Sequence, residues 1–175
     1  MASYFKAVSE ELKDWKKALL VIVLTVARLI YGWSWFEAGL HKLTWLSDGQ
    51  LNSVKKIGTM VTNLAGPNVK SYDPLYINKL FAWLGETIFA GAMPAVTDFL
   101  VVIFEILIGV VLILGFRLFW AGLVATFLNL QFIAGGSFNN FGYIWTNLAI
   151  MKFAKYGELI GLDGYLRFKK AKKLL

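Results

Sequence analysis

The sequence predicts an all-α integral membrane protein, a four-helix bundle with an amphipathic surface helix before its first span. Three observations carry this prediction. The chain has 175 residues, which suits a single four-span membrane domain covering 1–175. It is 58% hydrophobic with a mean hydropathy of +0.60, well above the apolar share of ordinary soluble proteins. Several apolar runs approach the roughly 20 residues that a membrane-spanning helix needs.

The first predicted element is an amphipathic helix over residues 4–17. Its apolar side chains recur at helical spacing, whereas lysines and a glutamate occupy the other faces. The first span follows directly, at about 18–40, so we expect the amphipathic helix to lie on the membrane surface beside it. The apolar stripe of this helix consists of Phe5, Val8, Leu12 and Trp15.

A long insertion, residues 47–95, separates the first two spans. It contains three proline breakers and two stretches with apolar helical stripes, so we expect it to be partly helical. A structureless loop of this length is unusual in a compact protein, and we therefore expect the insertion to pack as a cap. The two stripes are Val54, Ile57, Val61 and Leu64, and Tyr76, Leu80, Phe81, Leu84 and Ile88.

The remaining spans are predicted at about 96–114, 118–134 and 143–162. Positive charges collect in the N-terminal segment, in a tight turn at 115–117 and in the C-terminal tail, whereas the turn at 135–143 is uncharged. Basic loops and tails usually stay in the cytoplasm. We therefore expect a multi-pass protein of the cell membrane with both termini cytoplasmic and an extracytoplasmic insertion.

The composition excludes several kinds of chemistry. The chain has no cysteine, which excludes disulfides, thiolate catalysis and iron–sulfur ligation. Its one histidine excludes a bis-histidine haem and a histidine zinc cluster within this chain. Any redox reaction must then use a diffusible cofactor, a partner subunit or direct contact between two substrates. The net charge of +7 lies largely in the tails, where anionic lipids would hold it, and nucleic-acid binding is not expected.

Two charged residues are expected deep in the membrane, Arg28 in the first span and Glu105 in the second. Such residues usually face the interior of a bundle, because an unpaired charge in hydrocarbon is costly. We therefore predict that they approach one another. Either they form a structural ion pair, or Arg28 binds an anion or a quinone carbonyl while Glu105 handles a proton. Gly32 and Gly39 share the face of Arg28 and would let a neighbouring helix come close.

A second group of polar and aromatic residues is predicted to form an outward-facing pocket. Glu37 and His41 are four residues apart, where they can hydrogen-bond on one helix face. Lys152 either joins a polar stripe of the fourth span or extends to the cytoplasmic surface. The aromatic members are either pocket walls or interfacial anchors. The candidate substrate-binding residues, besides Arg28, are Trp35, Lys42, Asn139, Asn140, Tyr143, Trp145 and Lys152.

The stretch RLIYGWSWFEAGLHKL (28–43) resembles the opening helix of the DoxX/DoxD membrane proteins, with an arginine, a glycine one turn on, aromatic residues, then glycine and lysine. The stretch 104–123 is similar to that family's second helix and turn, including the membrane glutamate. The asparagine-rich turn, Trp145 and a final G-x-D motif at 161–163 fit as well. The insertion makes the chain more similar to DoxD proteins, the large subunits of thiosulfate:quinone oxidoreductases, than to the shorter DoxX proteins.

The resemblance implies a membrane subunit that joins two thiosulfates to tetrathionate and passes two electrons to a membrane quinone, with a DoxA-like small subunit as partner. The quinone would be a diffusible acceptor, and no metal or haem is expected in this chain. Arg28, His41 and Lys42 are candidates to bind the thiosulfate dianion, and Glu37, His41 or Glu105 to relay protons. Two other classes stay open: a structural or assembly subunit of a respiratory complex, and a small-anion transporter. A homo-oligomer is a further option.

Overall fold

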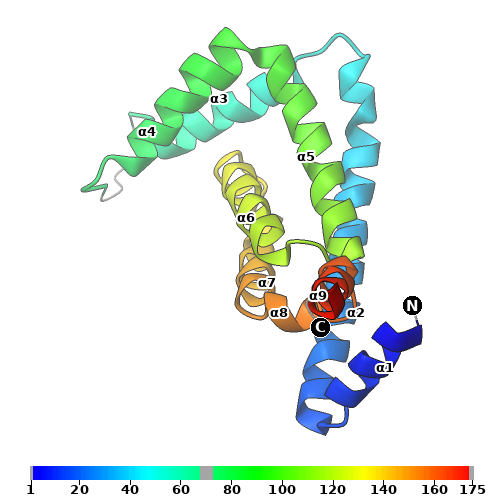
Figure 1. The fold of residues 1–175 in the computed structure, drawn as a ribbon. Coiled ribbons are helices and arrows are strands. Elements are labelled where there is room, and N and C mark those ends of the chain that lie inside the picture. Colours follow the sequence, from blue (N-terminus) through cyan, green and yellow to red (C-terminus); the bar gives the residue numbers. More distant parts are fainter. Residues whose placement is uncertain (1, 68–72, 174–175) are drawn as a thin grey trace.

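The computed structural model describes residues 2–67 and 73–173, and every regular element in these ranges is a helix (Figure 1). The all-α class predicted from the sequence is therefore confirmed. Within the described residues, two helical segments are long and apolar enough to cross a membrane: Trp15–Leu46, with a mean hydropathy of 1.8, and Pro94–Leu114, with 2.7. The helix Leu118–Ala134 is apolar but shorter. By length and composition, the described chain thus has two candidate membrane spans.

Two helix pairs form the body of the molecule (Figure 1). In the first pair, α2 (Trp15–His41) packs along α5 (Pro94–Leu114). In the second pair, α6 (Leu118–Ala134) packs along α7 (Phe141–Lys152). The buried apolar core joins the two pairs, and it consists of Tyr31, Trp35, Ile108, Leu112, Leu118, Ala121, Ala125, Leu128 and Ile150. The predicted positions of the first three spans agree with α2, α5 and α6.

Glycines set the distance between α2 and α5. A Cβ atom added at Gly32 would lie 2.9 Å from the Leu112 Cβ, and one added at Gly109 would lie 2.5 Å from the Phe36 backbone nitrogen. A Cβ added at Gly39 would meet the next turn of α5 just as closely. Any larger residue at these positions would push the helices apart, so the expected close approach at Gly32 and Gly39 is confirmed.

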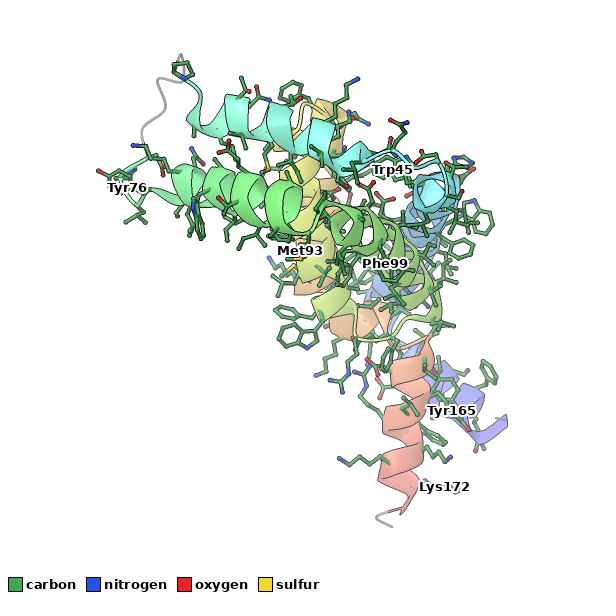
Figure 2. All side chains as sticks on the ribbon, turned by 90° about the horizontal axis from the view of Figure 1, so that it is seen from above. Trp45, Tyr76, Met93, Phe99, Tyr165 and Lys172 are labelled. Carbon is green, nitrogen blue, oxygen red and sulfur yellow. The ribbon has the colours of Figure 1, made fainter. Side chains whose placement is uncertain are left out.

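The insertion forms an arm across one end of the two pairs (Figure 1). The arm consists of α3 (Asn52–Ala65), α4 (Ile77–Trp83) and the π-helical η2 (Leu84–Ala92). Helix α3 packs against the other two, and Figure 2 shows Tyr76 at the outer end of the arm. The short 3-10 helix η1 (Lys42–Leu46) leads from α2 toward it. The prediction of a partly helical insertion is therefore confirmed.

One carboxylate attaches the arm to α5. Asp98 is 3% exposed and accepts hydrogen bonds from the backbone N–H groups of Asn52 and Ser53, at 2.9 and 2.7 Å. These N–H groups belong to the first turn of α3, where backbone N–H groups have no hydrogen-bonding partners within the helix. Asp98 therefore acts as an N-cap supplied by a different helix.

The single continuous helix predicted for the fourth span, at 143–162, is not present, because the helix there is broken. The backbone leaves helical geometry at Phe153, with φ −108° and ψ 17°. The carbonyl oxygens of Gly157 and Ile160 accept hydrogen bonds from a side chain of α2 instead of continuing a helix. An apolar pattern does not reveal such a partner. The chain therefore forms α7, a single turn α8 (Ala154–Gly157) and a separate helix α9 (Leu162–Lys173).

The predicted helix over 4–17 is also divided. Helix α1 (Ala2–Glu11) ends before Asp14, whose carboxylate caps the start of α2. The predicted apolar stripe is displaced as well, since Tyr4 is 7% exposed and Phe5 is 57% exposed. The cap competes with helix continuation, because an aspartate side chain that accepts a nearby backbone N–H favours a helix start.

Helices α1 and α9 lie together at the end of the molecule opposite the arm (Figures 1 and 2). The Tyr4 hydroxyl donates a hydrogen bond to the Leu159 carbonyl oxygen at 2.5 Å, and its ring meets that of Tyr165 edge-on at 5.6 Å. The G-x-D motif lies here too. The Asp163 carboxylate accepts a hydrogen bond from the Arg117 backbone N–H at 2.7 Å, where Arg117 has a left-handed φ of 49°. The predicted tight turn before α6 is thus confirmed, and Asp163 holds it.

Candidate functional site

Arg28 is buried in the middle of α2, where it is 3% exposed. Its guanidinium donates hydrogen bonds to four backbone carbonyl oxygens: Leu112 and Ile113 at 2.6 Å each, Gly157 at 2.9 Å and Ile160 at 2.5 Å. We call these five residues the carbonyl cradle. The first two carbonyls belong to the last turn of α5, where the helix dipole favours a cation. Arg28 thus ties the end of α5 and the segment after α8 to α2.

The prediction that Arg28 approaches Glu105 is wrong. Glu105 pairs with Lys42, whose Nζ lies 2.5 and 2.6 Å from the two carboxylate oxygens. Helices α2 and α5 are antiparallel, so Arg28 meets the end of α5 whereas Gly39, near the end of α2, meets Glu105. At 1.5 Å per residue, the two charges are separated by roughly 16 Å along the helix axes. The antiparallel register of α2 and α5 therefore keeps Arg28 and Glu105 apart.

The Lys42–Glu105 ion pair lies in aromatic surroundings. The Glu105 side chain is 2% exposed and that of Lys42 is 25% exposed. The Lys42 ammonium lies 5.4 Å from the ring centroid of Phe132 and 5.7 Å from that of Trp45, so both rings stabilise the cation. Removing either charge would leave the other buried without a partner. The pair is thus held as a unit.

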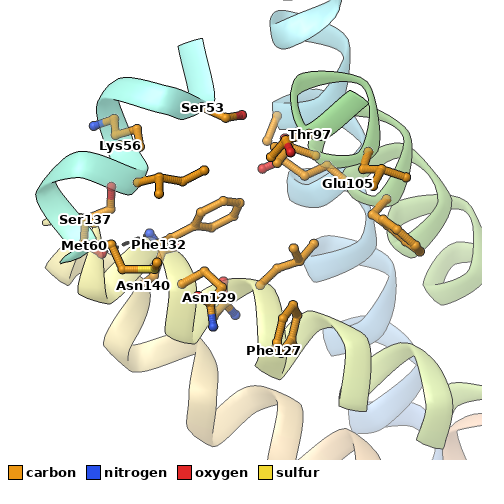
Figure 3. Close-up of a pocket in the computed structure, with 18 of the residues that line it drawn as sticks. Ser53, Lys56, Met60, Thr97, Glu105, Phe127, Asn129, Phe132, Ser137 and Asn140 are labelled. Carbon is orange, nitrogen blue, oxygen red and sulfur yellow. Dashed lines mark hydrogen bonds between the residues drawn. The ribbon is translucent and has the colours of Figure 1, made fainter. Parts of the chain in front are cut away.

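A cavity of about 720 Å³ lies between the arm and the two helix pairs (Figure 3). Its walls come from α2, η1, α3, α4, η2, α5 and α6 and from the start of α7, and they are mostly apolar. The Lys42–Glu105 pair borders it. A mostly apolar cavity of this size with a few polar groups is typical of a small-molecule site.

A buried polar network borders the same cavity. The Tyr31 hydroxyl donates a hydrogen bond to Asn147 Oδ1 at 2.9 Å and accepts one from Asn129 Nδ2 at 3.2 Å. Within the described residues, Asn129 Oδ1 has no hydrogen-bonding partner, and neither have Trp35 Nε1 and Ser53 Oγ. All three side chains line the cavity. An unpaired buried polar atom costs about 1–3 kcal/mol, so these atoms are unused hydrogen-bonding capacity in the cavity wall, although neighbouring protein atoms cover them.

The predicted site residues fall into two groups. Those that line the cavity are Trp35, Lys42, Glu105, Asn139, Asn140 and Tyr143. Those that lie away from it are Arg28, Glu37, His41, Trp145 and Lys152. Glu37 and His41 are on an exposed face of α2, and across residues 2–67 and 73–173 no hydrogen bond joins them to each other, contrary to expectation. Trp145 is 66% exposed, and Lys152 lies over the ring of Phe153, so the predicted pocket is wrong in these members.

Some cavity residues were not predicted, although part of the signal is in the sequence. Helix α2 presents one stripe to the cavity at helical spacing: Tyr31, Ser34, Trp35, Ala38 and Lys42. Ser53 and Lys56 reach the cavity from the arm, whose position depends on the cap supplied by Asp98. The hydrogen bond between Ser53 and Asp98 joins residues 45 positions apart, and such a contact cannot be recognised from the periodicity of the sequence.

This arrangement can bind a molecule with an apolar body and a few polar atoms. Lys42 supplies a charged hydrogen-bond donor, Glu105 an acceptor that can also carry a proton, and Asn129 a free amide oxygen. Helix packing fixes the positions of these groups, because η1, α5 and α6 carry one each. No family model matches this chain, and no curated protein or solved structure shows significant similarity to it.

Proposed function

We propose that the chain is the quinone-binding membrane subunit of a thiosulfate:quinone oxidoreductase. The observation that supports this most directly is the cavity, whose mostly apolar wall includes the Lys42–Glu105 pair and residues with unpaired buried polar atoms. A lipid-soluble molecule with a polar head would fit such a site. The sulfur substrate comes from the resemblance of residues 28–43 and 104–123 to the DoxX/DoxD family.

The proposed topology has four spans in the cell membrane: α2, α5, α6, and α7 continued by α8. Helix α6 has 17 residues and would extend about 26 Å, close to the thickness of the hydrocarbon core. Both terminal helices, α1 and α9, carry lysines and lie at the same end of the molecule (Figure 1). The positive-inside rule would place this end in the cytoplasm and the arm outside.

The head of the quinone would bind at the polar residues of the cavity wall. Lys42 would donate a hydrogen bond to one carbonyl oxygen, and the Trp35 indole N–H is a second available donor. On accepting two electrons and two protons, a quinone becomes a quinol. Glu105 is placed to pass a proton, because its carboxylate touches the Lys42 ammonium and borders the cavity. Asn129 Oδ1 would then accept a hydrogen bond from a hydroxyl group.

The electrons would come from two thiosulfate dianions, which lose one electron each as a sulfur–sulfur bond joins them in tetrathionate. Arg28 is not proposed for this step, because the carbonyl cradle occupies its guanidinium. Lys56 and Lys42 are the cations at the cavity, with Asn139 and Asn140 as neutral donors. A DoxA-like subunit outside the membrane would complete the thiosulfate site.

The test is quinone binding and turnover by the full chain in lipid nanodiscs, with and without the small subunit. Quenching of tryptophan fluorescence should report binding of a benzoquinone, since Trp35 and Trp45 line the cavity. The Asn129→Leu variant should bind it about tenfold more weakly, equivalent to one lost hydrogen bond. Phe119→Leu, on the same helix but outside the cavity, is the matched control. Absence of quinone binding would remove the proposal, and binding without thiosulfate-dependent quinol would remove only the sulfur substrate.

A structural or assembly subunit is the second candidate, and the carbonyl cradle favours it. Arg28 there holds three segments of the chain together without facing the cavity. In that case cavity substitutions such as Asn129→Leu would lower the yield of a larger complex and leave turnover per complex unchanged. A small-anion transporter has lost its main support, since Arg28 is not free to bind an anion.

A further inference from the structure

Two phenylalanines on different helices line the cavity and keep much of their surface exposed. Phe104 on α5 and Phe127 on α6 line the cavity, yet they are 39% and 43% exposed. The Phe127 ring also packs against Phe81 of α4, with centroids 6.1 Å apart. One turn further along the same helices, Leu107 and Leu130 are 48% and 50% exposed. Apolar side chains from three helices thus gather on this side of the cavity, where an opening would face lipid.

Another edge of the cavity is polar. Lys56 from the arm and Ser137 and Asn139 from the turn between α6 and α7 line it, and Figure 3 shows Lys56 and Ser137 away from Phe127. Lys56 and Asn139 are both exposed. The Asn63 side chain, also on α3, donates a hydrogen bond to the Ala134 carbonyl oxygen at 2.7 Å, which holds the arm against this turn. A water-soluble molecule would meet hydrogen-bond donors and a cation here.

We infer that the cavity has two routes of access for two kinds of substrate. A lipid-soluble molecule enters from the bilayer between Phe104 and Phe127, and its apolar tail stays between α5 and α6 while its head reaches Asn129. A small anion enters at the polar edge, past Lys56 and Asn139. The inference rests on the proposed function, in which these molecules are a long-tailed quinone and thiosulfate. Apolar contact at the first opening favours binding in proportion to the tail length.

The absence of cysteine from the chain makes a direct test possible, because a single introduced cysteine is the only thiol. Phe127→Cys places it at the apolar opening and Asn139→Cys at the polar edge. Phe119→Cys is the matched control, since Phe119 is also on α6, is 45% exposed and lies outside the cavity. Each variant of the full chain is placed in lipid nanodiscs and reacted with a bulky maleimide. Binding is then measured for two benzoquinones with the same head, one with a decyl tail and one with none.

The label on Phe127→Cys should weaken binding of the decyl probe about tenfold and leave the tailless probe unchanged. The label on Phe119→Cys should change neither. Conversely, thiosulfate should slow the labelling of Asn139→Cys, and the decyl probe should slow that of Phe127→Cys.

Equal effects of labels at the Phe127→Cys and Phe119→Cys positions would overturn the bilayer route. Thiosulfate protection of neither cysteine, or of both equally, would overturn the polar route. If neither quinone binds the unlabelled natural chain, the proposed function itself fails, and this inference falls with it.

Discussion

The carbonyl cradle and the cavity are built on the same two helices, α2 and α5, but they treat buried polar groups in opposite ways. In the cradle, Arg28 donates four hydrogen bonds to backbone carbonyl oxygens, so every one of them has a partner. In the cavity wall, the Lys42–Glu105 pair is complete, but Asn129 and Trp35 keep unpaired atoms. The first arrangement has only a structural use, whereas the second has capacity left for a ligand. The hydrogen-bonding partners of a buried charged side chain therefore indicate its role better than the extent of its burial does.

The largest effect is expected from breaking the cradle. Arg28→Met would remove four hydrogen bonds to buried carbonyl oxygens, and it should lower the free energy of unfolding by about 4 kcal/mol. Arg28→Lys should recover part of this loss, because an ammonium lacks the planar fork of a guanidinium. Thermal unfolding in detergent measures both. If Arg28→Met keeps its unfolding temperature but loses quinone affinity, Arg28 belongs functionally to the cavity and the comparison fails.

The next effect concerns the ion pair at the cavity. Lys42→Met leaves the Glu105 carboxylate buried without a cation and should destabilise the fold by about 3 kcal/mol. The double variant Lys42→Met/Glu105→Leu should recover much of that loss, since no charge is then left alone. A double-mutant cycle on unfolding free energies tests this. Additive losses in the double variant would show that the two side chains do not act as a pair.

A smaller effect is expected where the arm meets α5. Asp98→Ala removes the cap of α3 and should cost about 1 kcal/mol. Amide hydrogen exchange should show faster exchange at Asn52 and Ser53 than in the natural chain, with α6 unchanged. Asp48→Ala is the control, because Asp48 is exposed and makes only local contacts. Equal exchange in both variants would mean that the arm is held by other contacts.

The smallest effect is expected at the exposed pair on α2. Glu37→Gln and His41→Ala should each change the free energy of unfolding by less than about 0.5 kcal/mol, because both side chains are exposed. Quinone binding should also be unchanged, since neither residue lines the cavity. A clear loss of quinone binding in either variant would show that the substituted residue contributes to the site although it does not line the cavity.

Sequence patterns predicted the helices more reliably than their contacts. Hydropathy located α2, α5 and α6, because long apolar runs and glycine breaks mark them directly. The end of α8 at Gly157 escaped prediction, since the carbonyl oxygens of Gly157 and Ile160 bind Arg28, which lies 129 and 132 residues away in sequence. The partner of Glu105 also escaped, because the antiparallel register of α2 and α5 chose Lys42. Backbone acceptors and helix register leave no trace in side-chain periodicity.

The carbonyl cradle joins parts of the chain that a ribosome makes at different times. The partners of Arg28 at Leu112 and Ile160 follow it by 84 and 132 residues. At roughly 5–20 residues per second, the last of these carbonyls is synthesised about 7–26 seconds after Arg28. In the proposed topology, the guanidinium would spend that interval without its acceptors, which is costly in hydrocarbon. The first span to be synthesised would thus be the last to complete its hydrogen bonds. Until the segment around α8 is made, water or the translocation machinery would have to solvate the Arg28 guanidinium.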